Sequence, residues 1–299
     1  MKDCITLSLK HKCNMNIKFF IRRKLRKQKE SHLILSKKDL AFLELELSKT
    51  KVIGIDTEFD WRTTYFPILS IIQISTKDKV FIVDCLKNSV EKVLKKYLED
   101  KNYLKIFHSA RSDTTVLSNS LNCKINNVFD IQIADKFLSG DEIKSYGKIV
   151  YKHFGIKLDK AETNSNWLKR PLSNDQIEYA FDDVDFLIEI YRFQKKALDK
   201  QMLIKVLKSS ENEAYLGSQP LKYSRLNKIQ HKSSKRDINI FIWREELAES
   251  KNIPPAHIVK DKYLKKLSKI KTHDVQAKRK IMTIFGDTAI TKEFISNFL

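Results

Sequence analysis

The chain has 299 residues, a formal net charge of +20, 42% hydrophobic residues and 31% charged residues. This length allows one large domain or two modest ones with real cores, and no uncharged apolar run approaches the ~20 residues of a membrane helix, so we expect no membrane association. Four scattered cysteines without a CxxC pair exclude a cysteine-based metal motif and fit a reducing cytoplasm, where we expect the protein.

The positive charge is concentrated toward the two ends of the chain. Lysine and arginine exceed aspartate and glutamate by 8 in residues 1–30 and by 10 in residues 201–299, whereas residues 31–200 carry only +2. A uniform enrichment in lysine does not explain this distribution. Cationic flanks would hold a polyanion while a middle with clustered acids acts on it with bound metal.

Residues 1–31 form a basic N-terminal extension with almost no acidic residues. Its apolar stretch is short and interrupted by charge, which argues against a signal peptide. An organelle transit peptide, a basic arm and an over-long start with Met15 as the true first residue all remain open. We assign no chemistry to this segment.

Residues 32–205 predict a mixed-sheet α/β domain. The expected elements are a strand and a helix within 32–50, a strand over Val52–Phe59, a hairpin of Ile68–Ser75 and Lys79–Asp84, a helix over 88–99 and a strand over 104–108. Three antiparallel strands followed by βα alternation are typical of a mixed sheet flanked by helices.

Two carboxylates lie on the strand Val52–Phe59. Side chains alternate along a strand, so Asp56 and Glu58 point to the same side, roughly 6–7 Å apart. Like charges this close are costly unless a cation or a shifted pKa relieves them, and hard oxygen ligands suit Mg²⁺ or Mn²⁺. The alternative is a strand that ends in ordinary surface acids.

A turn-rich segment precedes a long helix expected from about Asp175 to Lys200. Its apolar stripe is Ile177, Ala180, Phe181, Val184, Leu187, Ile188 and Tyr191, and its expected solvated face is Glu178, Asp182, Asp185 and Glu189. Asp183 instead shares a second, largely aromatic stripe with Tyr179. A carboxylate away from the solvated face needs a partner, which a metal shared with Asp56 and Glu58 would supply. Exposure at a helix end is the alternative.

Three further residues near the expected strand at 104–108 are ambiguous from sequence. Asp113 opens a helix, where it would also serve as a cap and complement the helix dipole. His108 at the strand end and Arg111 fit either a structural or a functional role.

The C-terminal third is expected to hold a linker and a small helical domain. Apolar periodicity is weak between Ser209 and Arg236, so residues 206–236 are expected to be a linker. Residues 237–299 predict short helices only, with a first one around Ile238–Ala248 and a break at Pro254-Pro255.

Three segments resemble, in order, the exonuclease motifs of the DEDD superfamily. They are Asp56-Thr57-Glu58, then His108-Ser109-Ala110 with Asp113, then Tyr179-Ala180-Phe181-Asp182-Asp183-Val184. The tyrosine four residues before the last aspartate is similar to the DEDDy branch.

Further stretches resemble the ribonuclease D family over roughly residues 32–200. They are Asp56–Phe59 with Tyr65-Phe66-Pro67 and Leu69–Gln73, and Leu158-Asp159-Lys160 with Ser165-Asn166-Trp167 and Arg170–Ser173. Asn166 departs from the family, which usually has aspartate there. The tail, with Trp243-Arg244, Ala248 and Pro254-Pro255, is loosely similar to a single HRDC domain, where the family often carries two.

The resemblance implies a ribonuclease H-like sheet with a site for two divalent ions, Mg²⁺ or Mn²⁺. By analogy, Asp56, Glu58 and Asp183 would bind the first ion, Asp56 would bridge to the second, and Asp113 would hold the second directly or through water. Tyr179 would orient the attacking water, with core packing as its alternative role. The helical tail would be an HRDC-like nucleic-acid-binding domain.

The implied activity is 3′→5′ hydrolysis of RNA that releases 5′-mononucleotides, with trimming of precursor-tRNA 3′ ends as the usual task. We expect a monomer whose Phe66 and Trp61–Tyr65 loop either stack on terminal bases or pack in the protein interior. Two alternatives remain. A DNA 3′→5′ exonuclease would use the same acids, and a non-catalytic nucleic-acid-binding protein would share the fold.

Overall fold

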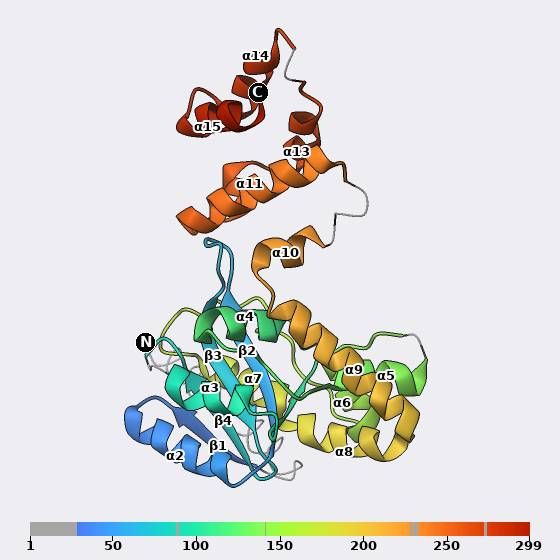
Figure 1. Ribbon diagram of the computed structural model, residues 1–299. Coiled ribbons are helices and arrows are strands. Elements are labelled where there is room, and N and C mark those ends of the chain that lie inside the picture. Colours follow the sequence, from blue (N-terminus) through green and yellow to red (C-terminus); the bar gives the residue numbers. More distant parts are fainter. Residues whose placement is uncertain (1–28, 88–89, 141, 228, 230–232, 272–273) are drawn as a thin grey trace, which may run out of the picture.

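A six-stranded mixed sheet forms the centre of the larger part of the molecule (Figure 1). The computed structural model describes residues 29–87, 90–140, 142–227, 229, 233–271 and 274–299, so the basic extension lies almost wholly outside the described residues. The strands are β1 (Glu30–Ile34), β2 (Val52–Asp60), β3 (Ile68–Ser75), β4 (Lys79–Asp84), β5 (Leu104–Phe107) and β6 (Val128–Asp130), in the order β1-β4-β3-β2-β5-β6. Strands β2, β3 and β4 are antiparallel and the other neighbours parallel, which confirms the predicted mixed sheet and its hairpin.

Helices cover both faces of the sheet. Helices α2 (Lys37–Ser48), α3 (Glu91–Glu99) and α4 (Arg111–Leu121) pack with Ile53 and Ile55 of β2 on one face. On the other face lie α5 (Ile131–Ser139), α6 (Tyr146–Phe154), α7 (Asn174–Asp185) and α8 (Leu187–Ala197). A Cβ added to Gly54 of β2 would lie 3.0 Å from the Leu187 Cβ, so this glycine allows α8 to approach the sheet closely.

The single long helix expected over 175–200 is wrong, because the chain forms α7 and α8 with a break at Phe186. The backbone N–H of Phe186 donates to the Tyr146 hydroxyl at 3.2 Å, and burial of Phe186 and Tyr146 fixes the break. Asp183 therefore lies in the last turn of α7, where the chain turns beside the sheet.

The expected linker is largely helical. Helix α9 (Lys200–Gly217) packs along α4 and β6, and α10 (Leu221–Leu226) follows it. A Cβ on Gly217 would lie 2.6 Å from the Arg111 carbonyl oxygen, so α9 lies too close to α4 for any side chain there. Sequence periodicity missed this packing because Val206, Ser210, Ala214 and Gly217 present a narrow, small-residue face.

The C-terminal helices form a second core. They are α11 (Lys235–Lys251), α12 (Pro255–Ile258), α13 (Asp261–Ser268), α14 (Ala277–Phe285) and α15 (Ala289–Phe298). The Trp243 ring packs edge-on against Phe285 and Phe294, with centroid distances of 6.1 and 5.1 Å. Helix α11 is longer than the predicted 238–248 because Ser234 and Asp237 form a capping box at its start.

The loop between β2 and β3 joins the two parts and rises toward α11 in Figure 1. The Asn252 side-chain oxygen accepts hydrogen bonds from the backbone N–H groups of Tyr65 and Phe66 at 3.1 and 3.2 Å. The Tyr65 side chain is fully buried, and the Arg225 guanidinium lies 4.8 Å from its ring centroid. Packing, not base stacking, is therefore the role of Tyr65.

Within the described residues, no helix combines the length and apolar character needed to cross a membrane.

Candidate active site

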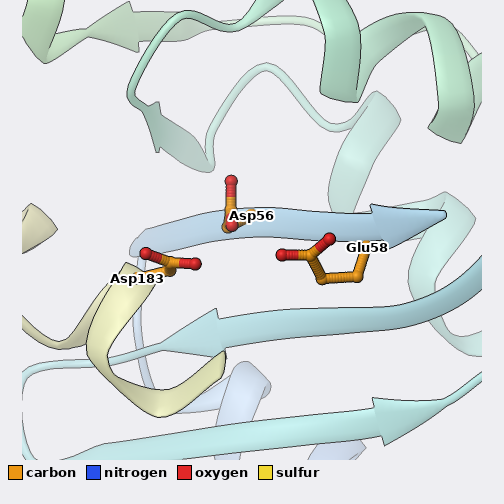
Figure 2. Close-up of side chains that lie close together, drawn as sticks. All are labelled: Asp56, Glu58 and Asp183. Atoms are coloured by element: carbon orange, nitrogen blue, oxygen red, sulfur yellow. The ribbon is translucent and has the colours of Figure 1, made fainter. Parts of the chain in front are cut away.

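Three carboxylates from two distant segments meet on the α7 side of β2. Oxygen atoms of Asp56, Glu58 and Asp183 lie within 4.8 Å of one another. Figure 2 shows Asp183 at the end of α7, facing the two carboxylates of β2. The strand places Asp56 and Glu58 on one side, as the alternation predicts, before a bulge between Glu58 and Phe59 shifts the register.

Asp113 lines the same cavity but does not belong to this group of three. Its Oδ1 accepts a hydrogen bond of 2.6 Å from the hydroxyl of Thr57, which lies between the two acids on β2. No side-chain cap is present at the start of α4, so the capping role considered for Asp113 is wrong. The buried Asp113 is instead fixed against β2, the strand that carries Asp56 and Glu58.

Burial and mutual repulsion raise the pKa values of all four acids. Burial, with the charges of Asp183 and Asp113, raises the pKa of Glu58 to about 9. Burial, with repulsion from Asp182, raises the pKa of Asp183 to about 7. Burial also raises the pKa of Asp113 to about 7, although the hydrogen bond from Thr57 acts in the opposite direction. The pKa of Asp56 is raised well above its usual range by burial and by the other three acids.

This donor set fits a divalent metal ion. All the ligand atoms are carboxylate oxygens, the class that Mg²⁺ and Mn²⁺ prefer, and a bound cation would relieve the repulsion that raises the pKa values. The acidic group is therefore a candidate metal site.

Tyr179 lies one helical turn before Asp183 and lines the cavity. Its hydroxyl is 3.2 Å from the Thr163 hydroxyl, and its ring lies 5.8 Å from that of Trp167. Burial and the nearby charge of Asp183 raise the pKa of Tyr179 well above its ordinary value, so the hydroxyl keeps its proton at neutral pH. It can therefore donate a hydrogen bond in the cavity, and one to the Asp183 carboxylate favours the charged form of that acid.

The structure separates the roles of His108 and Arg111. The His108 ring lines the cavity, where its Nε2 lies 3.1 Å from the Lys144 carbonyl oxygen, and burial lowers its pKa. The Arg111 guanidinium points away and forms a two-bond ion pair with Glu213 of α9, at 2.6 and 2.9 Å. Arg111 therefore ties α4 to α9.

Two charged residues in the cavity, Asp159 and Lys160, carried no assigned role in the sequence. Lys160 lines the site and is close enough to Asp183 to influence the pKa of that acid. The aliphatic end of its side chain passes Gly147, where an added Cβ would lie 3.3 Å from the Lys160 Cε. The only sequence signal for it was its place in the Leu158-Asp159-Lys160 stretch.

The stretch after Lys160 is anchored to the sheet beside the site. Arg170 forms a buried, two-bond ion pair with Asp84 of β4, at 2.8 and 3.0 Å. Among the described residues, the side-chain oxygen of Asn166 accepts a hydrogen bond from the Leu168 N–H, and its carbonyl oxygen accepts one from the Gln176 side chain of α7. Nothing in these contacts gives Asn166 a role toward substrate.

The acidic face of the 175–200 region is less solvated than predicted. Asp182 is buried, and the ammonium group of Lys29 lies 3.8 and 3.2 Å from the carboxylates of Asp185 and Glu189. The expectation of a solvated face is therefore wrong for Asp182.

Comparison with known proteins identifies the family. The family model described as 3′-5′ exonuclease matches residues 32–199. Ribonuclease D of Desulfotalea psychrophila is 31% identical over 257 residues, which cover 81% of this chain and 68% of that protein. The chain covers 62% and 59% of two other ribonucleases D, from Nitrobacter hamburgensis and Bartonella henselae.

Two solved structures share the fold. The crystal structure of Escherichia coli RNase D, described as an exoribonuclease involved in structured RNA processing, has a TM-score of 0.70 at 24% identity and covers 79% of this chain and 65% of that one. Trypanosoma brucei RNase D in complex with RNA U12 has a TM-score of 0.57 at 20% identity, covering 64% and 72%. With residues 32–199 forming a 3′-5′ exonuclease domain, the chain belongs to the ribonuclease D family.

Proposed function

We propose that the protein is a metal-dependent 3′→5′ exoribonuclease that releases 5′-mononucleotides and trims the 3′ ends of precursor tRNA and other structured RNA. The carboxylates of Asp56, Glu58 and Asp183 within 4.8 Å carry the proposal, because their raised pKa values call for a cation. The relatives are ribonucleases by name, and one was solved with RNA, which favours RNA over DNA. We infer a cytoplasmic monomer.

Two Mg²⁺ or Mn²⁺ ions fit this site. Asp56, Glu58 and Asp183 would hold one ion. Asp56 and Asp113 would hold the other, and Asp113 would do so through a water molecule where its carboxylate accepts the hydrogen bond from Thr57. When bound, such ions lower the pKa of the attacking water and stabilise the leaving 3′-oxygen.

The protein's own groups position the reactants. A 3′-terminal nucleotide would enter the cavity of about 320 Å³ that the acids line. The Lys160 ammonium would attract its phosphate, and the protonated Tyr179 hydroxyl would orient the water that attacks the last phosphodiester in line. Hydrolysis breaks the bond to the preceding 3′-oxygen and leaves the phosphate on the released nucleotide.

Replacing Tyr179 by phenylalanine should slow hydrolysis about 10- to 100-fold, the usual effect of losing a group that orients a ligand from outside the coordination sphere. RNA affinity should stay nearly unchanged, because the ring and its packing against Trp167 are retained. Single-turnover kinetics and fluorescence anisotropy measure the two quantities. An unaltered rate would reduce Tyr179 to a packing role.

The C-terminal helices supply the positive surface that would hold the body of a structured RNA. Residues 201–299 carry a net charge of +10, and α13 contributes the exposed Lys262, Lys265 and Lys266 to it. Phosphate contacts of this kind are sensitive to salt and largely independent of sequence. This supports the HRDC-like nucleic-acid-binding role that we propose for residues 237–299.

Changing these three lysines to glutamine should weaken binding of a tRNA precursor and make it less dependent on salt. In a plot of log binding constant against log salt concentration, the slope should become less steep by about 0.9 for each duplex phosphate that the protein no longer neutralises. Cleavage of short oligonucleotides should not change, since they would contact the acidic cavity and not α13. The matched control is the double change of exposed Lys37 and Lys38 on α2 to glutamine. Unchanged tRNA affinity in the triple variant would remove α13 from the RNA-binding surface.

The function itself is tested by incubating the purified protein with a 3′-extended tRNA, with and without Mg²⁺, beside a DNA strand of matched sequence. We expect stepwise shortening of the RNA and release of 5′-mononucleotides only with Mg²⁺. Faster loss of the DNA would favour a DNA exonuclease. No hydrolysis combined with no Mg²⁺ uptake by calorimetry would favour a binding protein.

A further inference from the structure

A second cavity, of about 630 Å³, lies beside the active site between α5 and α9. We call it the α5 cavity. Its lining includes Ser109, Asp130, Gln132, Lys136, Phe137, Ile143 and Glu213. None of them belongs to the acidic group.

The α5 cavity and the active-site cavity share a wall. Ser109 lines both of them, in a left-handed conformation with φ of +63°. The buried Asp130 carboxylate fixes this wall by accepting from the backbone N–H groups of Ser109 and Ala110, at 3.0 and 2.8 Å. Gln132 of the α5 cavity also lies 3.3 Å from the His108 ring of the active site. Because Ser109 is exposed, a strand that left one cavity across it would enter the other.

The lining has the chemistry that binds a nucleotide. The Phe137 and Ile143 side chains are 36% and 65% exposed and supply an apolar surface, the aromatic part of which suits base stacking. Arg111 neutralises Glu213, whereas Lys136 is exposed and forms no ion pair with any described residue, so its positive charge is available for a phosphate.

We propose that the α5 cavity binds the one or two nucleotides that precede the 3′-terminal nucleotide of an RNA strand, the base against Phe137 and the phosphate at Lys136. This rests on the proposed exoribonuclease function and adds a subsite to it. The cavity would make affinity depend on strand length without taking part in hydrolysis.

Steady-state kinetics on RNAs of two, three, four and six nucleotides test the subsite. We expect Phe137→Ala to raise the KM of the hexanucleotide about 5- to 150-fold, the range that loss of one base–aromatic stack produces. The kcat should not change, and neither should the inhibition constant of the product 5′-UMP, a mononucleotide with no preceding nucleotide to place in the α5 cavity. Lys136→Gln should act in the same direction. Tyr151→Ala, at a 53% exposed aromatic of α6 outside the cavity lining, should change nothing.

An equal loss of affinity for 5′-UMP and for the hexanucleotide, or no loss for the hexanucleotide, would overturn the subsite. If the unmodified protein hydrolyses none of these RNAs, the proposed function has failed, and the subsite is then judged by binding. For this, the Asp183→Asn variant is crosslinked to a hexanucleotide with 4-thiouridine second or third from the 3′ end. A crosslink within α5 supports the subsite, and crosslinks confined to other elements overturn it.

Discussion

Replacing Asp183 by asparagine should lower the rate of RNA hydrolysis by about 10³-fold or more, and Glu58→Gln should do the same. Each change removes an anionic ligand from the group of three whose oxygens lie within 4.8 Å. The metal supplies several kcal/mol of transition-state stabilisation, and each 1.36 kcal/mol is tenfold in rate. Single-turnover hydrolysis of a labelled oligoribonucleotide at saturating Mg²⁺ measures the loss.

The same variants should remain folded without metal. Because Asp183 and Glu58 repel their neighbours, a neutral amide of the same shape should leave the melting temperature in EDTA unchanged or raise it. The matched control is Asp175→Asn, an exposed acid in the first turn of the same helix, which should keep normal activity. Near-normal turnover by Asp183→Asn would refute the site.

The difference in melting temperature between Mg²⁺-loaded and EDTA-treated protein should widen as pH rises from 5.5 to 8.5. The pKa values of Glu58, Asp113 and Asp183 are raised to about 9, 7 and 7, so the metal-free folded chain holds protons that the unfolded chain releases near pH 4. The stability of the metal-free protein therefore falls as pH rises through this interval. Metal affinity rises over the same interval, because the ligands must lose those protons to bind.

Each pKa unit corresponds to about 1.4 kcal/mol, so Glu58 alone, whose pKa lies above the whole interval, should widen the gap by roughly 5–10 °C for a chain of this size, and Asp113 and Asp183 should add to this. Differential scanning calorimetry at several pH values, with EDTA and with excess Mg²⁺, measures it. Glu58→Gln removes the group with the highest pKa of these three acids and should reduce the slope. A gap that stays constant or narrows toward alkaline pH would contradict the assignment of these acids as metal ligands.

Helix α9 extends the packed part of the exonuclease domain beyond residue 205. It lies against α4 through Gly217. A shortened chain that keeps α9 retains its packing against α4, whereas one ending at 205 exposes the surface that α9 covers.

Local sequence patterns predicted five of the six strands, the hairpin of β3 and β4, and the side of β2 on which Asp56 and Glu58 lie, because strand alternation is a local property of the backbone. They did not predict β6. Helical periodicity likewise separated Asp183 from its acidic neighbours, although it missed the break at Phe186. Both signals arise within one element, so they are readable from spacing alone.

How the elements meet depends on tertiary packing. It brought Asp183 to β2, fixed Asp113 through Thr57, buried Asp182 and turned an expected linker into a docked helix. Distances between elements depend on how closely side chains allow them to pack, and no periodicity in a single segment contains that information.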